Sequence, residues 1–212
     1  MKPDPKQFRP PVHKLEFIHH KADLVRAEHW PSGLVPVDVE KILWAYDLRV
    51  EPFPSLRSDF DVDALLRCDL KTIIVDQGEY MDDRMQNRLR FSLAHEFGHF
   101  ILHGDLARKL SFKNVEEWVE FMHRVPEEPH KWFELQAHEF AGRLLVPLDL
   151  LTKEFNKWVS KAEKSGFRQW DKSGDAVKEH IADRIGRTFG VSRIVIEKRL
   201  IRERLWPPKA AK

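Results

Sequence analysis

Two histidines and a glutamate near the middle of the chain have the residue types and the spacing of a hydrolytic metal site. His95, Glu96 and His99 form the pattern H-E-x-x-H. On a helix, residues four apart lie one turn apart on the same side, so the imidazoles of His95 and His99 can reach one metal ion. Glu96 lies beside them, where its carboxylate can accept a proton from a water molecule that the metal activates.

The residues around this motif favour a helix with a histidine face and an apolar face. On an ideal helix, His99 and His103 fall within about 80° of His95, whereas Leu93 and Phe97 lie on the opposite side. A solvated helix face that carries histidines fits the same pattern. A third ligand elsewhere in the chain must therefore decide between the two interpretations.

That third ligand is expected on a second helix, at residues 134–147, which read ELQAHEFAGRLLVP. Glu134 and His138 share one face of this helix, whereas Glu139 lies about 140° from Glu134 and cannot face the same metal. Two histidines and one glutamate, with the fourth position left to water, are typical of a catalytic rather than a structural zinc site. The sequence therefore predicts one Zn²⁺ per chain.

Small residues predict that the two helices approach closely. Gly98 borders the histidine face of the first helix, and Ala137 and Ala141 lie near Glu134 on the second. Glycine lowers the stability of a helix, so close approach of a ligand or of another backbone is a physical reason for Gly98.

Three further residues are candidates for a hydrogen bond to a ligand or to the oxyanion of the transition state: Tyr80, His103 and His138. His103 lies two turns, or about 12 Å, from His95, so the two rings and that of His99 cannot all meet one ion. A hydrogen-bonding role is therefore expected for His103.

The composition is that of a globular protein with a heavily charged surface. The chain has 212 residues, of which 42% are hydrophobic and 33% charged, enough for one core with a small appendage. The net charge of +2 gives no general case for binding nucleic acid or a membrane. The single cysteine, Cys68, excludes an internal disulfide and suits a reducing compartment. No long apolar run or signal-peptide core is visible.

The rest of the pattern indicates an α+β fold. Four prolines in residues 1–14 predict an extended or disordered arm. A small antiparallel sheet is expected beside the metal helix, and its edge strand could pair with an extended peptide. The expected elements are helices at 17–30, 37–48 and 115–124, strands at 49–53, 63–68 and 72–75, a loop at 76–83, and a break at 125–130.

The C-terminal part is predicted to be helical. Residues 181–204 have the spacing of a helix-turn-helix, with a turn at Gly190–Ser192 and several arginines on the second helix. The expected domains are an arm with a first helix (1–30), a metallopeptidase core (31–150) and a helical C-terminal region (151–212).

The two motifs together resemble those of the ImmA/IrrE family of zinc metallopeptidases, which are H-E-x-x-H enzymes of gluzincin-like type. The resemblance rests on RLRFSLAHEFGHFILH, on E-x-Q-A-x-x-F-A-x-x-L-L-V-P and on RTFGVSRIVIEKRL, and it covers roughly residues 35–205. It implies a zincin-like core in which His95, His99 and Glu134 hold zinc and Glu96 is the base. One departure is His138, where the family more often has Asn or Asp.

The same resemblance implies a cytoplasmic peptidase that acts in transcription regulation or stress response. Its expected partner is a protein substrate, a helix-turn-helix repressor or an antitoxin. One alternative is a regulator that binds DNA through residues 181–204 and keeps a structural metal site. A toxin–antitoxin-type protein whose metal site serves recognition or a non-peptidase reaction is another. A catalytically inactive scaffold is the last, and the intact Glu96 argues against it.

Overall fold

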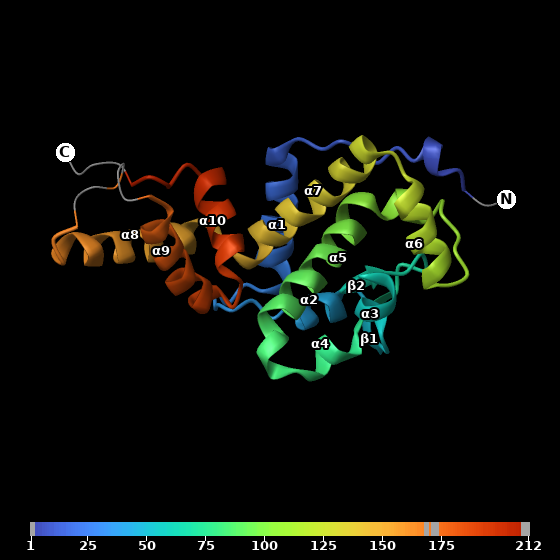
Figure 1. The fold of residues 1–212 in the computed structure, drawn as a ribbon, viewed down its shortest axis with the longest axis horizontal. Helices are drawn as coiled ribbons and strands as arrows, with labels where there is room; N and C mark the ends of the chain where they lie inside the picture. Colours follow the sequence, from blue (N-terminus) through green and yellow to red (C-terminus); the bar gives the residue numbers. More distant parts are fainter. Residues whose placement is uncertain (1–2, 168–169, 171–173, 209–212) are drawn as a thin grey trace.

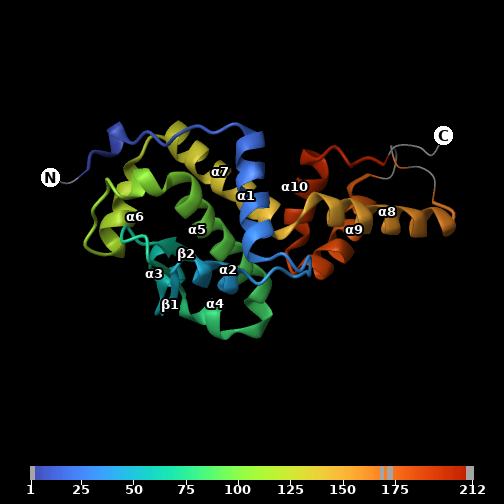
Figure 2. The ribbon, with the colours of Figure 1, turned by 180° about the vertical axis from the view of Figure 1, so that it is seen from behind.

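Two long helices lie side by side at the centre of the structure, a computed structural model that describes residues 3–167, 170 and 174–208. These are α5 and α7. The sheet and its short helices lie toward one end, and α8, α9 and α10 lie at the other (Figures 1 and 2). In chain order the elements are η1 (Pro5–Gln7), α1 (Leu15–His29), α2 (Val39–Ala45), β1 (Arg49–Phe53), α3 (Leu56–Phe60), β2 (Ala64–Leu66), β3 (Thr72–Asp76), α4 (Gln77–Met81), η2 (Asp83–Met85), α5 (Gln86–Ala107), α6 (Val115–Arg124), α7 (Glu127–Leu145), α8 (Leu148–Lys164), α9 (Gly174–Phe189) and α10 (Arg193–Arg202).

The α+β class is confirmed, but the sheet is mixed rather than antiparallel. Its strand order is β1-β3-β2. β2 and β3 form the expected antiparallel pair, with Leu65 opposite Ile74. β1 pairs with β3 in parallel, with Val50 opposite Ile73. The reason is the connection: the chain passes through α3 and β2 before β3, and such a crossover is what a parallel pair requires.

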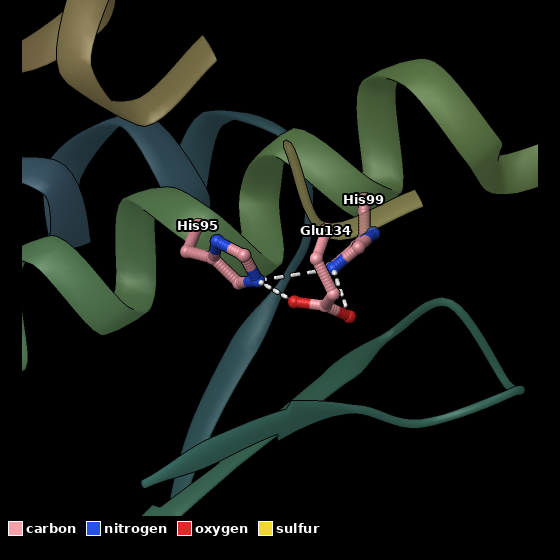
Figure 3. Close-up of side chains that lie close together, drawn as sticks. All are labelled: His95, His99 and Glu134. Carbon is pink, nitrogen blue, oxygen red and sulfur yellow. Dashed lines mark hydrogen bonds and ion pairs between the residues drawn. The ribbon is translucent and has the colours of Figure 1, made fainter. Parts of the chain in front are cut away.

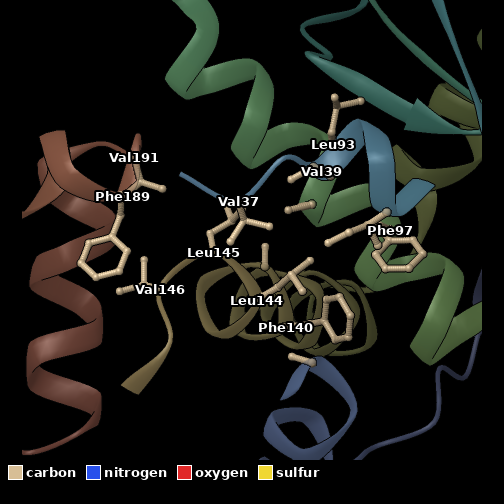
Figure 4. Close-up of a cluster of buried hydrophobic side chains, with 14 of the residues drawn as sticks. Val37, Val39, Leu93, Phe97, Phe140, Leu144, Leu145, Val146, Phe189 and Val191 are labelled. Atoms are coloured by element: carbon tan, nitrogen blue, oxygen red, sulfur yellow. The ribbon is translucent and has the colours of Figure 1, made fainter. Parts of the chain in front are cut away.

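Close packing of α5 on α7 forms the centre of the core. Gly98 lies against the backbone of α7, where an added Cβ would be 3.1 Å from both Cα and the carbonyl oxygen of Ala137. The expected close approach at Gly98 is therefore an approach of helix to helix. Beside it, the rings of Phe97 and Phe140 meet edge to face with centroids 5.8 Å apart. Figure 4 shows these side chains continuing into Phe189 of α9.

One local expectation is wrong and a second is only partly right. Residues 76–83, expected to be a loop, contain the short helix α4 and the start of η2. The side chain of Asp76 caps α4 by accepting a hydrogen bond from the Glu79 N–H. The break predicted at 125–130 is present but is only Val125 and Pro126, because α6 ends at Arg124 and α7 begins at Glu127. Pro129 fits its first turn, where a backbone N–H has no partner within the helix. The N-terminal arm follows the extended alternative, since residues 3–14 form no helix or strand apart from η1.

The C-terminal helices join the rest of the protein through charged groups as well as apolar ones. Arg199 of α10 is 3% exposed and contacts Glu139 of α7 at 3.3 Å and Glu203 at 2.6 Å. Arg202 also pairs with Glu139, at 3.0 Å. One buried apolar cluster runs from α1 to α10, so the domain boundaries at 31 and 151 stay predictions.

We expect Gly98→Ala to destabilise the fold, because its Cβ has no space against the backbone of Ala137. The crowding outweighs the helix propensity gained from alanine, and the free energy of unfolding should fall by about 1 kcal/mol. Gly104→Ala on the same helix is the matched control, because its Cβ would lie 3.8 Å from the nearest atom, in Leu70. Thermal denaturation of both variants measures the difference. Equal or greater stability in Gly98→Ala would contradict the close packing of α5 on α7.

Candidate metal centre

Two neighbouring helices bring the three predicted ligands together. His95 and His99 come from α5, and Glu134 comes from α7 (Figure 3). The Nε2 atom of His95 lies 3.0 Å from Oε2 of Glu134 and 3.1 Å from Nε2 of His99. The Nε2 atom of His99 lies 3.6 Å from Oε1 of Glu134. One ligand atom from each residue therefore lies within 4.8 Å of the other two.

These distances fit zinc. Ligand atoms that surround a zinc ion tetrahedrally at about 2.0–2.1 Å lie roughly 3.3 Å from one another. The separation of 3.1 Å between the two Nε2 atoms and that of 3.0 Å between Nε2 of His95 and Oε2 of Glu134 are close to that value, and the other carboxylate oxygen, Oε1, lies 3.6 Å from Nε2 of His99. Two imidazole nitrogens and one carboxylate are also ligand types that zinc prefers, and they leave a fourth position open.

The charges within the set favour a cation. Burial alone would raise the pKa of Glu134, but its hydrogen bonds to His95 and His99 outweigh that effect and lower the pKa. Burial alone would lower the pKa of His95, but the hydrogen bond to Glu134 and the charges of Glu96 and Glu134 outweigh it and raise the pKa. An ionised carboxylate therefore faces two ring nitrogens.

His103 lies behind the ligands rather than among them. Its Nδ1 atom is 3.0 Å from Nδ1 of His99. Burial, and then the nearby rings of His99 and His13, lower the pKa of His103 to about 2. A neutral His103 can accept the proton on Nδ1 of His99, which leaves Nε2 of His99 free to bind a metal.

Glu96 lies between the ligands and the sheet. It is 8% exposed, and its Oε2 atom accepts a hydrogen bond of 2.8 Å from the backbone N–H of Leu66 in β2. Its other oxygen, Oε1, lies 3.9 Å from Nε2 of His95. Burial is the main cause of a raised pKa at Glu96, against the opposing charges of His99 and His95.

A salt bridge holds β2 against α5. Asp63, directly before β2, accepts hydrogen bonds from both Nε and Nη2 of Arg88 in α5, the shortest at 2.6 Å. Arg88 also contacts Glu79 at 3.0 Å. A bidentate arginine–carboxylate pair is directional as well as strong, so it sets the position of β2 relative to the ligand helix.

The ligands open into a cleft of about 440 Å³ between β2 and α6. His138 lines it, with its ring centroid 4.5 Å from that of His95. Tyr80 does not line the cleft, because its ring packs against the apolar core. His130, which we did not single out from the sequence, lies 3.9 Å from Glu134. His130 is four residues before Glu134, so on one helix the two would share a face. The sequence did not indicate this, because residues 125–130 were expected to break the helix.

Comparison with protein families agrees with this geometry. The family model Peptidase_M78, described as IrrE N-terminal-like domain, matches residues 80–201, more than half of the chain. The matched region contains both ligand helices. A comparison with curated proteins gave no match. Within the described residues, each helix is too short or too polar to cross a membrane.

We expect the purified protein to carry about one zinc ion per chain, and Glu134→Ala to lose most of it. Removing the carboxylate removes one of three ligands and the charge that favours a cation at the two imidazoles. Elemental mass spectrometry of untagged protein measures the metal. Glu128→Ala, in the exposed first turn of the same helix, is the control and should keep its zinc. Unchanged zinc in Glu134→Ala would exclude Glu134 as a ligand.

Proposed function

We propose that this chain, which belongs to the Peptidase_M78 family, is a zinc-dependent endopeptidase that cleaves an extended segment of a protein partner. The family supports a metallopeptidase-type function. The observation that carries the finer proposal is the convergence of His95, His99 and Glu134 on one point, with Glu96 beside them and hydrogen-bonded to the outer edge of β2.

The residues of the site divide the work of hydrolysis. His95, His99 and Glu134 would hold the zinc ion, which when bound makes a water molecule more acidic and polarises the peptide carbonyl. Oε1 of Glu96 is the free oxygen of that carboxylate, because Oε2 is held by the Leu66 N–H. Glu96 takes the proton of the attacking water at Oε1 and passes it to the leaving amine.

The environment of Glu96 supports this role. A base that must hold a proton between two steps needs a pKa nearer neutrality than that of an exposed carboxylate. Burial raises the pKa of Glu96 in that direction. Its hydrogen bond to Leu66 also keeps the carboxylate in one orientation, so that Oε1 stays directed at the reacting groups.

The edge strand supports an extended peptide as the substrate. Asp63 and Arg67 bond to β3 through their backbone groups, with lengths of 2.9 Å each. Because such bonds alternate along an antiparallel pair, the N–H and C=O of Ala64 point to the other side of β2, toward the free edge. A peptide lying in the cleft can add to that edge as a further strand and bring its backbone past Glu96.

We further infer that the partner is a regulatory protein in the cytoplasm, of repressor or antitoxin type. The resemblance to the ImmA/IrrE family supports the class of partner, and the single Cys68 suits a reducing compartment. DNA binding through residues 181–204 finds less support. Arg199 is buried, and Arg193 and Arg202 of the second helix pair with glutamates.

We also propose that His138 steadies the oxyanion. It lines the cleft beside His95, and burial is the main cause that lowers its pKa to about 4. Its ring is therefore neutral at pH 7 and can donate one N–H without adding a positive charge next to the metal.

The test of the reaction is Glu96→Ala. We expect this variant to keep its zinc, because Glu96 is not a ligand, but to lose cleavage by about 10³-fold, because no other group takes the proton. Zinc content by mass spectrometry and hydrolysis of a library of fluorescence-quenched peptides give the two readings. Wild-type cleavage that persists in Glu96→Ala would exclude the mechanism, and a metal-loaded wild type that cleaves nothing in the library would direct the search to binding partners.

His138→Ala should lower kcat by about 10²-fold and leave KM nearly unchanged, as expected for a donor that acts only in the transition state. Because the pKa of His138 lies at about 4, the pH–rate profile above pH 5 should keep its shape in the variant. His130→Ala is the comparison, since His130 is half-exposed at the other side of Glu134. If kcat falls further in His130→Ala than in His138→Ala, His130 rather than His138 stabilises the oxyanion.

A further inference from the structure

The N-terminal arm, residues 3–14, lies against the back of the metal centre. It runs along α7 from the end near α6 to the start of α1 (Figures 1 and 2). The matched family region begins only at residue 80. Nothing about the arm therefore follows from the family match, and its contacts have to be argued from this chain alone.

Local interactions give the arm a defined shape. The side chain of Asp4 accepts a hydrogen bond of 3.0 Å from the N–H of Lys6 and caps the short helix η1. Nη1 of Arg9 donates to the carbonyl oxygen of Phe8 at 2.8 Å. Prolines at four positions restrict the backbone, which reduces the conformational entropy lost when the arm is held in place.

The first route from the arm to the metal centre is aromatic. Phe8 is 3% exposed, and its ring meets that of Phe133 edge to face with centroids 5.3 Å apart. Phe133 in turn stacks on the imidazole of His99, with centroids 4.0 Å apart. Phe133 therefore packs on the ring of the proposed ligand His99, and Phe8 packs on the other side of the contact, against Phe133.

The second connection between the arm and the metal centre is Gln136, a buried residue of α7. It forms hydrogen bonds to the arm and packs against His103. Its Oε1 accepts a hydrogen bond of 2.7 Å from the N–H of His13, and its Nε2 donates to the carbonyl oxygen of Pro11 at 2.9 Å. Nε2 of Gln136 also lies 3.4 Å from Nε2 of His103. Because its two protons go to the carbonyl oxygens of Pro11 and Trp132, this approach is a packing contact rather than a hydrogen bond. His103 is the residue whose Nδ1 lies 3.0 Å from Nδ1 of His99.

We propose that the N-terminal arm is a positioning element of the metal centre, which holds the ring of His99 in its ligating orientation through Phe8–Phe133 and through Gln136–His103. Both routes end on the same imidazole, one on its face and one on its Nδ1 atom. The inference rests on the proposed metal site but not on the proposed peptidase reaction. Groups behind a metal ligand commonly change metal affinity by 10–100-fold.

A purely structural role is the competing explanation. Phe8 also meets Phe121 of α6 edge to face at 5.8 Å, so its loss would loosen the wall of the cleft and lower stability. Zinc affinity separates the two roles, because a merely structural residue elsewhere would lower stability to a similar extent without changing how His99 binds metal.

The test is the zinc affinity of Phe8→Ala in the full chain, measured by competition with a chromophoric chelator. We expect it to fall about tenfold, and Phe8→Leu, which restores most of the side-chain volume, to recover most of that loss. Val12→Ala is the control on the arm itself, since Val12 is 68% exposed. Phe155→Ala is the control for stability, since Phe155 is equally buried but lies in α8. Both controls should stay within about twofold of wild type.

A second measurement keeps the result independent of the proposed function. Ring ¹⁵N spectra of metal-free protein report the tautomer of His99, which we expect to be single in wild type and mixed in Phe8→Ala. If wild type binds no zinc, the metal site and the role of the arm at that site are both excluded, and a tautomer change in Phe8→Ala would then show only that the arm orients the ring of His99. If zinc affinity and tautomer are both unchanged in Phe8→Ala, the proposal is overturned. Should that variant fail to fold, Gln136→Met, which removes both hydrogen bonds from α7 to the arm, decides by the same two readings.

Discussion

The close approach of α5 and α7 is the constraint on which the rest of the structure depends. Gly98 and Ala137 have almost no side chain between the two helices, so the backbones can pack against each other. That contact lies beside the proposed ligand His99 on one helix and within one turn of Glu134 on the other. The side chains of His95, His99 and Glu134 have fixed lengths and have to meet across the space between α5 and α7. A larger separation of the two helices would therefore take Glu134 out of reach of the two imidazoles.

The packing of α5 on α7 brings the site residues together, and their charges then set the role that each glutamate can play. The carboxylate of Glu134 is partly buried, and it remains ionised because His95 and His99 face it. Glu96, the neighbouring acid, is held by a backbone N–H of β2 instead, and burial moves its pKa the opposite way. Two glutamates within one small cleft thus differ in what they can do, since one is suited to hold a cation and the other to accept a proton.

The C-terminal helices show how one pattern can arise from two causes. A helix-turn-helix spacing is expected both for DNA recognition and for two helices that pack on a core. Here Arg199 is taken out of solvent between Glu139 and Glu203, and it joins α10 to α7. A buried ion pair of this kind adds little net stability but is costly to break, so it favours one arrangement of the helices over others.

The sequence by itself determined the local part of this protein. The spacing of His95 and His99, the apolar face of their helix, and the acidic residue at Glu134 are properties of neighbouring residues, and the geometry of a helix converts them directly into positions in space. The tertiary structure alone decided what depends on distant segments: the parallel pairing of β1 with β3, the exclusion of Tyr80 from the cleft, and the seating of Phe8 behind Phe133. The physical reason is that a helix sets distances only along itself, whereas the distance between two elements is set by the side chains packed between them.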